Sequence, residues 1–169
     1  TLANVIAGNG AANELLGAAG NDTLTGNGGN DLLDGGEGDD TLNGGDNNDT
    51  IIGGAGSDTI DVGTGFNTIV YNAANFGSDT IGSFDADGGT PANQDRIDLS
   101  GLGVTAANFA TRVVESAVGG STLLTVRDAS LATIGTIQIN GVGNAAIDIN
   151  DFTLATTGAV LPGATTGNN

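Results

Sequence analysis

The chain of 169 residues contains no cysteine, histidine, methionine or tryptophan, and it has only one tyrosine. Without cysteine it has neither disulfides nor thiol chemistry. Without histidine it cannot form an H-E-x-x-H zinc protease site, a Ser-His-Asp triad or a proximal haem ligand. No serine lies within a G-x-S-x-G sequence. We therefore expect no catalytic site in this chain, and any catalytic domain would lie outside it.

Positive charge is also scarce. The only basic residues are Arg96, Arg112 and Arg127, against 20 acidic residues, and the net charge at pH 7 is −17. Nucleic-acid binding needs a basic surface, so it is not expected. No run of eighteen apolar residues occurs, so no membrane span is expected. The chain begins at Thr1 without a charged and then apolar leader, so the sequence shows no cleavable signal peptide.

What the chain does have is a nine-residue repeat. Seven consecutive windows from Gly8 to Val70 align without insertion, and residues 35–43 show the pattern most clearly as G-G-E-G-D-D-T-L-N. Glycine is frequent at the first, second and fourth positions. The sixth position holds Asn13, Asp22, Asp31, Asp40, Asp49, Asp58 and Asn67. The eighth holds Leu15, Leu24, Leu33, Leu42, Ile51, Ile60 and Ile69.

Each column of the repeat has a physical reason. Glycine accepts positive φ without steric cost, so a six-residue turn can point its carbonyl groups inward at an ion. The aliphatic eighth residue is the inward residue of a three-residue strand, with the seventh and ninth residues facing outward. A disordered linker can have a similar Gly/Asn/Asp composition. Such a linker, however, has no need for an unbroken aliphatic column.

The distribution of charge predicts a bound cation. Residues 1–70 contain eleven acidic residues and no basic residue. Aspartates stacked in register about 4.8 Å apart repel one another unless a counter-charge lies between them. Carboxylate and backbone carbonyl oxygens suit Ca²⁺. A core only one aliphatic column thick per sheet cannot offset the chain entropy. We therefore expect metal binding to supply much of the folding free energy, which disfavours a β-helix that needs no metal.

The pattern G-G-x-G-x-D-x-U-x resembles the Ca²⁺-binding nonapeptide repeat of RTX proteins. The resemblance implies an all-β fold, a right-handed parallel β-roll over residues 1–81, in which two windows form one coil. Each turn then stacks on the turn two windows later, and about three to five Ca²⁺ ions lie between turns. The implied pairs are Asp22 with Asp40, Asp31 with Asp49 and Asp40 with Asp58, with weaker end sites at Asn13 with Asp31 and Asp49 with Asn67. The implied ligands also include backbone groups of Gly20, Gly29, Gly36, Gly38, Gly45, Gly54 and Gly56.

After Val70 the nine-residue period breaks. Residues 77–81 restore the repeat phrase after a three-residue insertion, and residues 95–97 form a further variant, so Asp79 and Asp95 are added to the expected ligands. A single capped helical turn is expected over residues 105–109. Strands are expected over residues 112–117, 121–127 and 134–140, with turns at residues 119–120 and 128–133.

This second half, about residues 68 to 155, is similar to the region that follows the repeats in type I-secreted bacterial proteins. The similarity lies in the phrases SDTI, QDRIDLSGLG, STLLTV, IQINGV and INDFTL. Serralysin-type proteases, family I lipases, alginate-epimerase repeat modules and some bacterial haem peroxidases carry such regions. The similarity implies a β-rich cap over residues 82–155 that closes the roll, followed by a flexible tail at 156–169.

Taken together, the two resemblances imply a calcium-binding module that is unfolded at low Ca²⁺ and folds on extracellular Ca²⁺. Such a module would support passage through a type I secretion apparatus, without a cleaved N-terminal signal, and stabilise an attached secreted or surface protein. The alternative is a surface-adhesion, S-layer or carbohydrate-binding module on the same roll, with a glycan or cell-surface partner.

Overall fold

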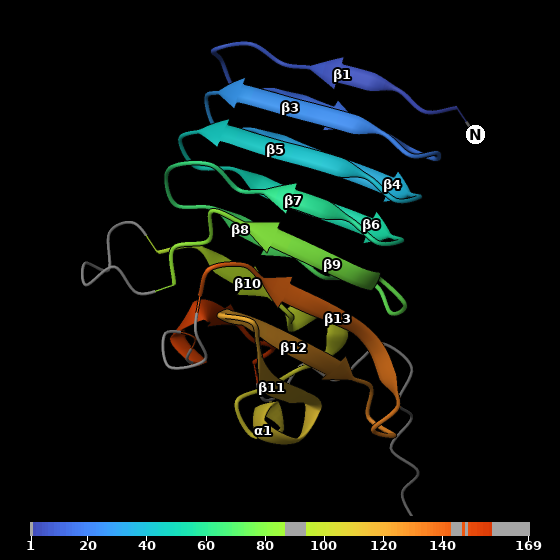
Figure 1. Cartoon of the computed structure of the whole chain (residues 1–169), viewed down its shortest axis with the longest axis vertical. Helices are drawn as coiled ribbons and strands as arrows, with labels where there is room; N and C mark the ends of the chain where they lie inside the picture. Colours follow the sequence, from blue (N-terminus) through green and yellow to red (C-terminus); the bar gives the residue numbers. More distant parts are fainter. Residues whose placement is uncertain (1, 87–93, 143–146, 148, 157–169) are drawn as a thin grey trace, which may run out of the picture.

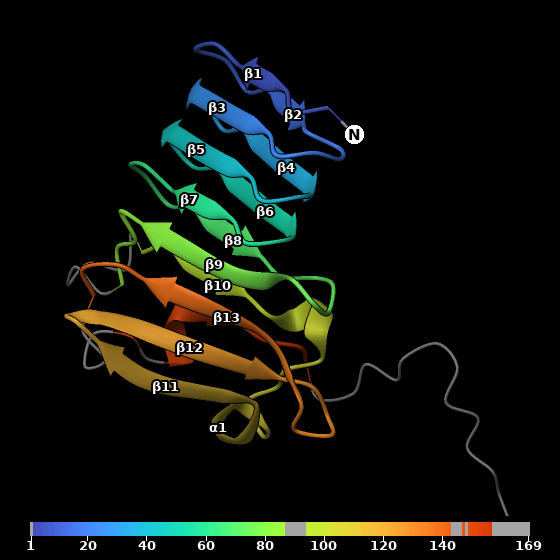
Figure 2. The same cartoon turned by 45° about the vertical axis from the view of Figure 1, so that its right-hand side comes forward.

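The computed structural model describes residues 2–86, 94–142, 147 and 149–156, and it is a parallel β-roll made of two sheets lying back to back (Figures 1 and 2). This confirms the expected all-β fold class. The eight-stranded sheet has the spatial order β1 (Val5–Ala7), β3 (Thr23–Gly28), β5 (Thr41–Asp46), β7 (Thr59–Asp61), β9 (Gly77–Gly82), β13 (Thr133–Ile139), β12 (Ser121–Arg127) and β11 (Val113–Val118). The six-stranded sheet has the order β14 (Phe152–Thr153), β10 (Arg96–Asp98), β8 (Thr68–Val70), β6 (Thr50–Ala55), β4 (Leu32–Glu37) and β2 (Glu14–Leu16).

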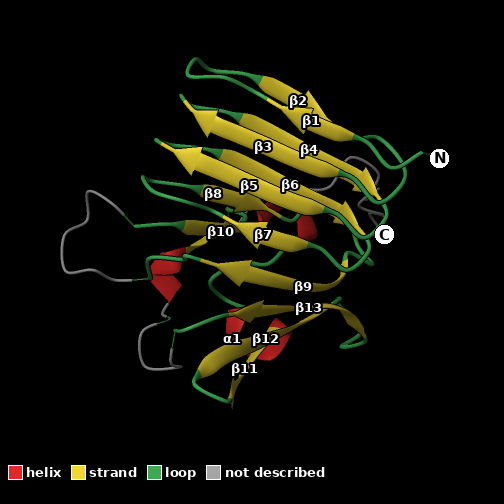
Figure 3. Ribbon diagram, turned by 45° about the horizontal axis from the view of Figure 1, so that its top comes forward, coloured by secondary structure: helices red, strands yellow, loops and turns green. Residues whose placement is uncertain are grey.

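Successive windows alternate between the two sheets, so two windows make one coil. Strands that neighbour each other in a sheet are therefore eighteen residues apart. Leu24 pairs with Leu42 in one sheet, and Leu33 pairs with Ile51 in the other. The expected stacking of each turn on the turn two windows later is confirmed. The turns thus form two lateral edges, one on each side of the roll (Figure 3).

The aliphatic eighth column forms the core between the sheets. Leu24, Leu33, Ile51 and Ile69 are fully buried, and the other members of the column are at most 7% exposed. The seventh-position threonines of the eight-stranded sheet lie on the outer face. This alternation of inward and outward residues confirms the expected register, in which burial of alternate side chains orients each short strand.

The C-terminal region continues both sheets of the roll and then covers its end. In one sheet, β13 pairs in parallel with β9, and β12 and β11 follow as antiparallel strands. In the other sheet, β10 pairs in parallel with β8 and β14 pairs in parallel with β10. The expected strand at residues 121–127 matches β12, and its two neighbours are each displaced by one residue. The rings of Phe109 and Phe152 pack at 4.8 Å between centroids beneath these strands.

Helical structure in the described part comprises α1 (Phe109–Arg112) and the short 3-10 turns η1 (Ser100–Leu102) and η2 (Ile149–Asp151). The expected helical turn at residues 105–109 is present as a hydrogen-bonded turn, in which the Asn108 N–H donates to the Thr105 carbonyl oxygen at 3.1 Å, and α1 follows it directly. Arg112, expected in a strand, ends α1 because its guanidinium donates to the carbonyl oxygens of Arg127 and Gly103. Within the described residues no helix has both the length and the apolar content needed to cross a membrane. Apart from Thr156, the expected tail lies outside the described residues.

Candidate metal centre

The sixth-position residues form one hydrogen-bonded ladder on each edge of the roll. In each ladder, Oδ1 of one residue accepts the backbone N–H of the sixth-position residue one coil earlier. On one edge the residues are Asn4, Asp22, Asp40, Asp58 and Asp79, with N–O distances of 2.6, 2.7, 2.9 and 2.9 Å. On the other edge they are Asn13, Asp31, Asp49, Asn67 and Asp95, with distances of 2.7, 2.8, 2.9 and 2.8 Å. The structure therefore brings every predicted Asp and Asn ligand into one of two columns.

The spacing within the ladders shows how the chain stays in register beyond the strict repeat. The N–H of Asp58 bonds to Asp79, 21 residues later, which confirms the inferred three-residue insertion. The N–H of Asn67 bonds to Asp95 across 28 residues. The side-chain ladder thus continues into the C-terminal region although the nine-residue period does not.

The second carboxylate oxygen of the ladder aspartates, Oδ2, differs from Oδ1 in its hydrogen bonding. Oδ2 is buried and, within the described residues, has no hydrogen-bond partner in the six aspartates Asp22, Asp31, Asp40, Asp49, Asp58 and Asp79. A buried carboxylate oxygen without a partner is costly unless a cation or a proton compensates it. Six such atoms in two columns are the main physical indication of a ligand.

The first-position glycine of each window shows which oxygens lie beside the ladder carboxylate. A Cβ added to Gly17 would lie 2.6 Å from Oδ2 of Asp22 and 2.5 Å from the carbonyl oxygen of Gly35 in the next coil. At Gly44 the corresponding distances, to Asp49 Oδ2 and the Val62 carbonyl oxygen, are 2.6 and 2.7 Å. The same pairing recurs at Gly8, Gly26 and Gly35, so five gaps between stacked turns have one side-chain and one backbone oxygen facing a common point.

The predicted turn glycines hold the backbone around these gaps. Their φ angles are positive, between +103° and +142°, at Gly20, Gly29, Gly36, Gly38, Gly45, Gly54 and Gly56. Ala18, Asn27 and Asn47 take equivalent turn positions with φ of 76°, 76° and 80°. A Cβ on Gly38 would meet the carbonyl oxygen of Gly20, so consecutive turns approach too closely for a larger residue.

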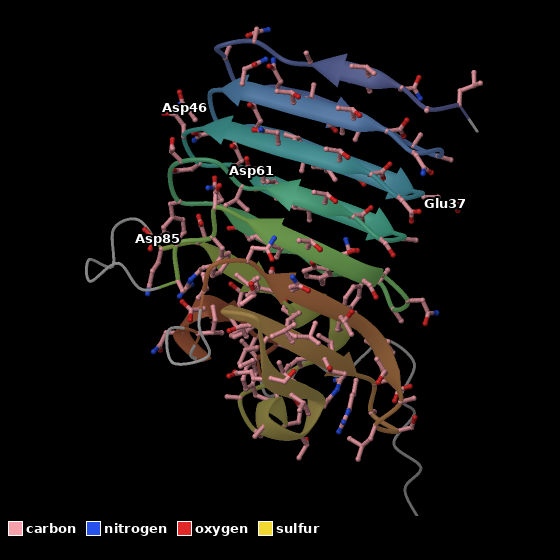
Figure 4. All side chains as sticks on the ribbon, viewed as in Figure 1. Glu37, Asp46, Asp61 and Asp85 are labelled. Carbon is pink, nitrogen blue, oxygen red and sulfur yellow. The ribbon has the colours of Figure 1, made fainter. Side chains whose placement is uncertain are left out.

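The chemistry of the gaps suits a hard cation. In the part of the chain that the structure describes, no three acidic side chains cluster into a carboxylate-only site. Ca²⁺ also accepts backbone carbonyl oxygens as ligands. Acidic residues outside the ladders, such as Glu37, Asp46, Asp61 and Asp85, lie toward the lateral edges (Figure 4). The residues present thus fit Ca²⁺, held by the ladder carboxylates and turn carbonyls.

Without a cation, the stacked carboxyls prefer to be protonated. Burial raises the pKa of Asp49 and of Asp58 to about 6, and the carboxylate one coil earlier raises each further, whereas the hydrogen bond from that coil lowers it. Burial likewise raises the pKa of Asp79 to about 7 and that of Asp40 above its ordinary value. In the unfolded chain an aspartate has a pKa of about 3.9.

We therefore expect that protonation of the ladder carboxyls at acidic pH partly stabilises the folded chain when calcium is absent. The folded chain binds protons at these carboxyls more tightly than the unfolded chain, so the stabilisation is complete below about pH 3.9 and is lost as pH rises through 6 to 7. In calcium-free, chelating-resin-treated buffer, the far-ultraviolet circular dichroism signal for β-structure is expected to be larger at pH 5.0 than at pH 7.5. A calcium-free signal that grows with pH over this range would contradict the assignment.

Two features differ from the sequence-based expectation. Both carboxylate oxygens of Asp95 accept backbone N–H groups, Oδ1 from Asn67 and Oδ2 from Asp85 at 2.8 Å, so Asp95 closes its ladder with hydrogen bonds. The first-position carbonyls, such as that of Gly35, were not among the predicted ligands although they face the Oδ2 atoms. The strict first-position glycine column was the signal that could have indicated them.

Comparison with known proteins agrees with this geometry. The family described as RTX calcium-binding nonapeptide repeat (4 copies) matches residues 7–42 and 34–69. Curated protein sequences give no significant match. The AlgE6R2 subunit of the Azotobacter vinelandii mannuronan C5-epimerase is 26% identical, and the alignment covers 92% of this chain and 95% of that chain with a TM-score of 0.52.

Two further solved structures align with lower scores. The AlgE6R3 subunit of the same epimerase is 27% identical over 94% of this chain and 88% of its own, with a TM-score of 0.37. The extracellular lipase LipA from Serratia marcescens is 16% identical over 92% of this chain but only 40% of the lipase, with a TM-score of 0.40.

Proposed function

The chain carries RTX calcium-binding nonapeptide repeats folded as a parallel β-roll, and from this premise we propose that it is a calcium-driven folding module of a secreted protein. It is unfolded at low Ca²⁺, folds on extracellular Ca²⁺ and stabilises the protein to which it is attached. The observation that carries the proposal is the set of buried, unpartnered Oδ2 atoms among the described residues, in a repeat region without a single basic residue.

The proposed ligands are those that line the gaps between stacked turns. Asp22, Asp31, Asp40, Asp49 and Asp58 supply Oδ2, Asn13 supplies its amide oxygen, and first-position and turn-glycine carbonyls complete each site. Bound Ca²⁺ supplies the positive charge that the repeat region lacks. The Oδ1–H–N ladder holds each carboxylate in place, because one oxygen is fixed to the neighbouring coil while the other faces the gap.

Cooperativity follows from the stacking. Each proposed site takes its carboxylate oxygen from one turn and a first-position carbonyl oxygen from the next coil. One coil therefore cannot complete a site alone. A quasi-one-dimensional array of this kind folds through neighbour interfaces, and ligand binding to the folded state alone stabilises it by mass action.

The same switch would suit export through a type I secretion apparatus. Cytosolic Ca²⁺ is submicromolar, whereas extracellular calcium modules bind with Kd of about 10⁻⁴ to 10⁻³ M. The repeats would remain threadable inside the cell and fold outside it, which biases movement in one direction. On this proposal the module acts outside the cell.

The proposal predicts a large spectral change on adding calcium. In EGTA at pH 7.5 the far-ultraviolet circular dichroism spectrum is expected to be that of an unfolded chain. Millimolar Ca²⁺ is expected to produce a β-rich spectrum with a cooperative midpoint, and equal Mg²⁺ serves as the control because it demands octahedral geometry and keeps its waters. A chain that is β-rich in EGTA and unchanged by Ca²⁺ would contradict the proposal.

A second candidate function is polysaccharide binding by the C-terminal region. A hollow of about 420 Å³ has a lining that includes Leu102, Asn108, Arg112, Asp128 and Ile134. The similarity to the R2 subunit of a mannuronan C5-epimerase supports a uronate-containing glycan as the first one to test. Calorimetric titration of the calcium-loaded chain with oligomannuronate is the measurement, and absence of heat at millimolar sugar would exclude this candidate.

A further inference from the structure

The sole tyrosine occupies a glycine position of the repeat. Tyr71 follows Gly53 by eighteen residues, the same offset as between the paired residues Ile51 and Ile69. The N–H of Tyr71 donates to the Asp98 carbonyl at 2.9 Å, as the N–H of Gly17 donates to the Asp34 carbonyl at 2.8 Å. Tyr71 therefore stands at the first position of its window.

The first position is where any side chain enters the gap that faces the ladder carboxylate. A Cβ at Gly17 meets Oδ2 of Asp22, and those at Gly35 and Gly53 meet Oδ2 of Asp40 and Asp58. Glycine fills this position in the first six windows. The seventh window has Val62, which is fully buried, and the next has Tyr71, which is 3% exposed. At these two positions the gap next to the ladder residue holds a side chain.

The ladder residues of these two windows have changed accordingly. Beside Val62 the sixth position is Asn67, an uncharged amide whose Nδ2 is buried and has no partner within the described residues. In the window of Tyr71 the ladder residue is Asp79. The Tyr71 hydroxyl and Asp79 Oδ2 are both buried, and neither completes a hydrogen bond of good geometry in the described part of the chain.

The Tyr71 hydroxyl and the Asp79 carboxyl nevertheless influence each other electrostatically. Burial raises the pKa of Tyr71 far above its ordinary value, and the adjacent Asp79 carboxyl raises it further. Burial also raises the pKa of Asp79, and contact with the Tyr71 hydroxyl acts in the opposite direction. The Tyr71 ring is held by Phe76, with 4.5 Å between ring centroids. A phenol O–H is a hydrogen-bond donor, and a carboxylate oxygen is an acceptor.

We infer that the side chains of Val62 and Tyr71 end the two columns of cation positions, and that the Tyr71 hydroxyl takes the place of an ion next to Asp79. This rests on the proposed calcium function and refines it. Asp79 is then a structural ladder residue that accepts hydrogen bonds from the Asp58 N–H and the Tyr71 O–H. The coil that joins the roll to the C-terminal strands is therefore stabilised without a metal ion of its own.

The first test counts ions. Bound Ca²⁺ per chain is measured by equilibrium dialysis at saturating calcium for the wild type, Asp79→Asn and Tyr71→Phe, with Asp40→Asn as the matched control in the same column. Asp40→Asn is expected to lose one ion, whereas Asp79→Asn and Tyr71→Phe are expected to keep the wild-type number. Loss of an ion in Asp79→Asn would show that Asp79 binds calcium, and loss of an ion in Tyr71→Phe would show that the phenol oxygen is a calcium ligand. Either result would overturn the inference.

The second test measures the Tyr71–Asp79 pair directly. A double-mutant cycle of Tyr71→Phe with Asp79→Asn is followed by urea unfolding in the buffer in which the wild type is folded. The expected interaction is about fivefold or more in the unfolding equilibrium constant. An interaction indistinguishable from none would overturn the pairing. If the wild type binds no calcium, the proposed function fails. The double-mutant cycle, measured in calcium-free buffer, still shows whether Tyr71 and Asp79 interact.

Discussion

Replacing Asp40 by asparagine is expected to raise the Ca²⁺ midpoint of folding at least about tenfold, equivalent to about 1.4 kcal/mol. Asparagine keeps an oxygen that can accept the N–H of Asp22, as Asn67 does for Asp49, so only the charge and Oδ2 are lost. Asp40 is informative because both of its neighbours in the column, Asp22 and Asp58, are also proposed calcium ligands. The midpoint is measured by circular dichroism in calcium-buffered solutions.

Two further variants separate the roles of Asp40. Asp40→Ala also removes the acceptor for the Asp22 N–H, and an unsatisfied buried N–H costs about 1–3 kcal/mol, so its midpoint is expected to exceed that of Asp40→Asn. Asp34→Ala removes a nearby charge at an outward ninth position and is the control, with a midpoint close to that of the wild type. If Asp40 served only as a hydrogen-bond acceptor, Asp40→Asn would match Asp34→Ala.

Replacing Gly35 by alanine is expected to destabilise the roll strongly. Gly35 does not have a positive φ, so alanine is compatible with its backbone. The new Cβ, however, would collide with Oδ2 of Asp40 and lie 2.6 Å from the Gly53 carbonyl oxygen. Overpacking of this kind costs about 1–3 kcal/mol, and the same methyl group occupies the gap that the ion needs.

The matched control for Gly35→Ala is Gly10→Ala. A Cβ on Gly10 would meet no atom within 4 Å, and Gly10 also lacks a positive φ. Urea unfolding at saturating Ca²⁺, together with counting of bound ions, is the measurement. Gly35→Ala is expected to unfold at lower urea and to bind one ion fewer. Equal behaviour of the two alanine variants would show that the first-position gap has no role.

The fold was predictable from the sequence because the same residue pattern recurs in seven consecutive windows. One aliphatic residue in nine could belong to any structure, whereas seven in fixed phase specify both the strand period and the inward face. The eighteen-residue coil came from the family resemblance, and the pairing of Leu24 with Leu42 bears it out. The sequence did not predict that helical structure continues as α1 to Arg112, whose carbonyl partners Gly103 and Arg127 are brought together only in the folded chain.

For the candidate site, too, part could be predicted from the sequence and part required the tertiary structure. The sequence alone indicated which residues form the ladders, since the sixth-position Asp and Asn column is visible without coordinates. It also predicted a bound cation, since no basic residue lies among the repeats. Only the tertiary structure decided what each oxygen does. It fixed Oδ1 to the neighbouring coil and left Oδ2 facing a gap, satisfied Asp95 with two N–H groups, and set Tyr71 against Asp79. The physical reason is that burial and hydrogen bonding belong to the contact between coils, which residues eighteen or more positions apart create only when they stack.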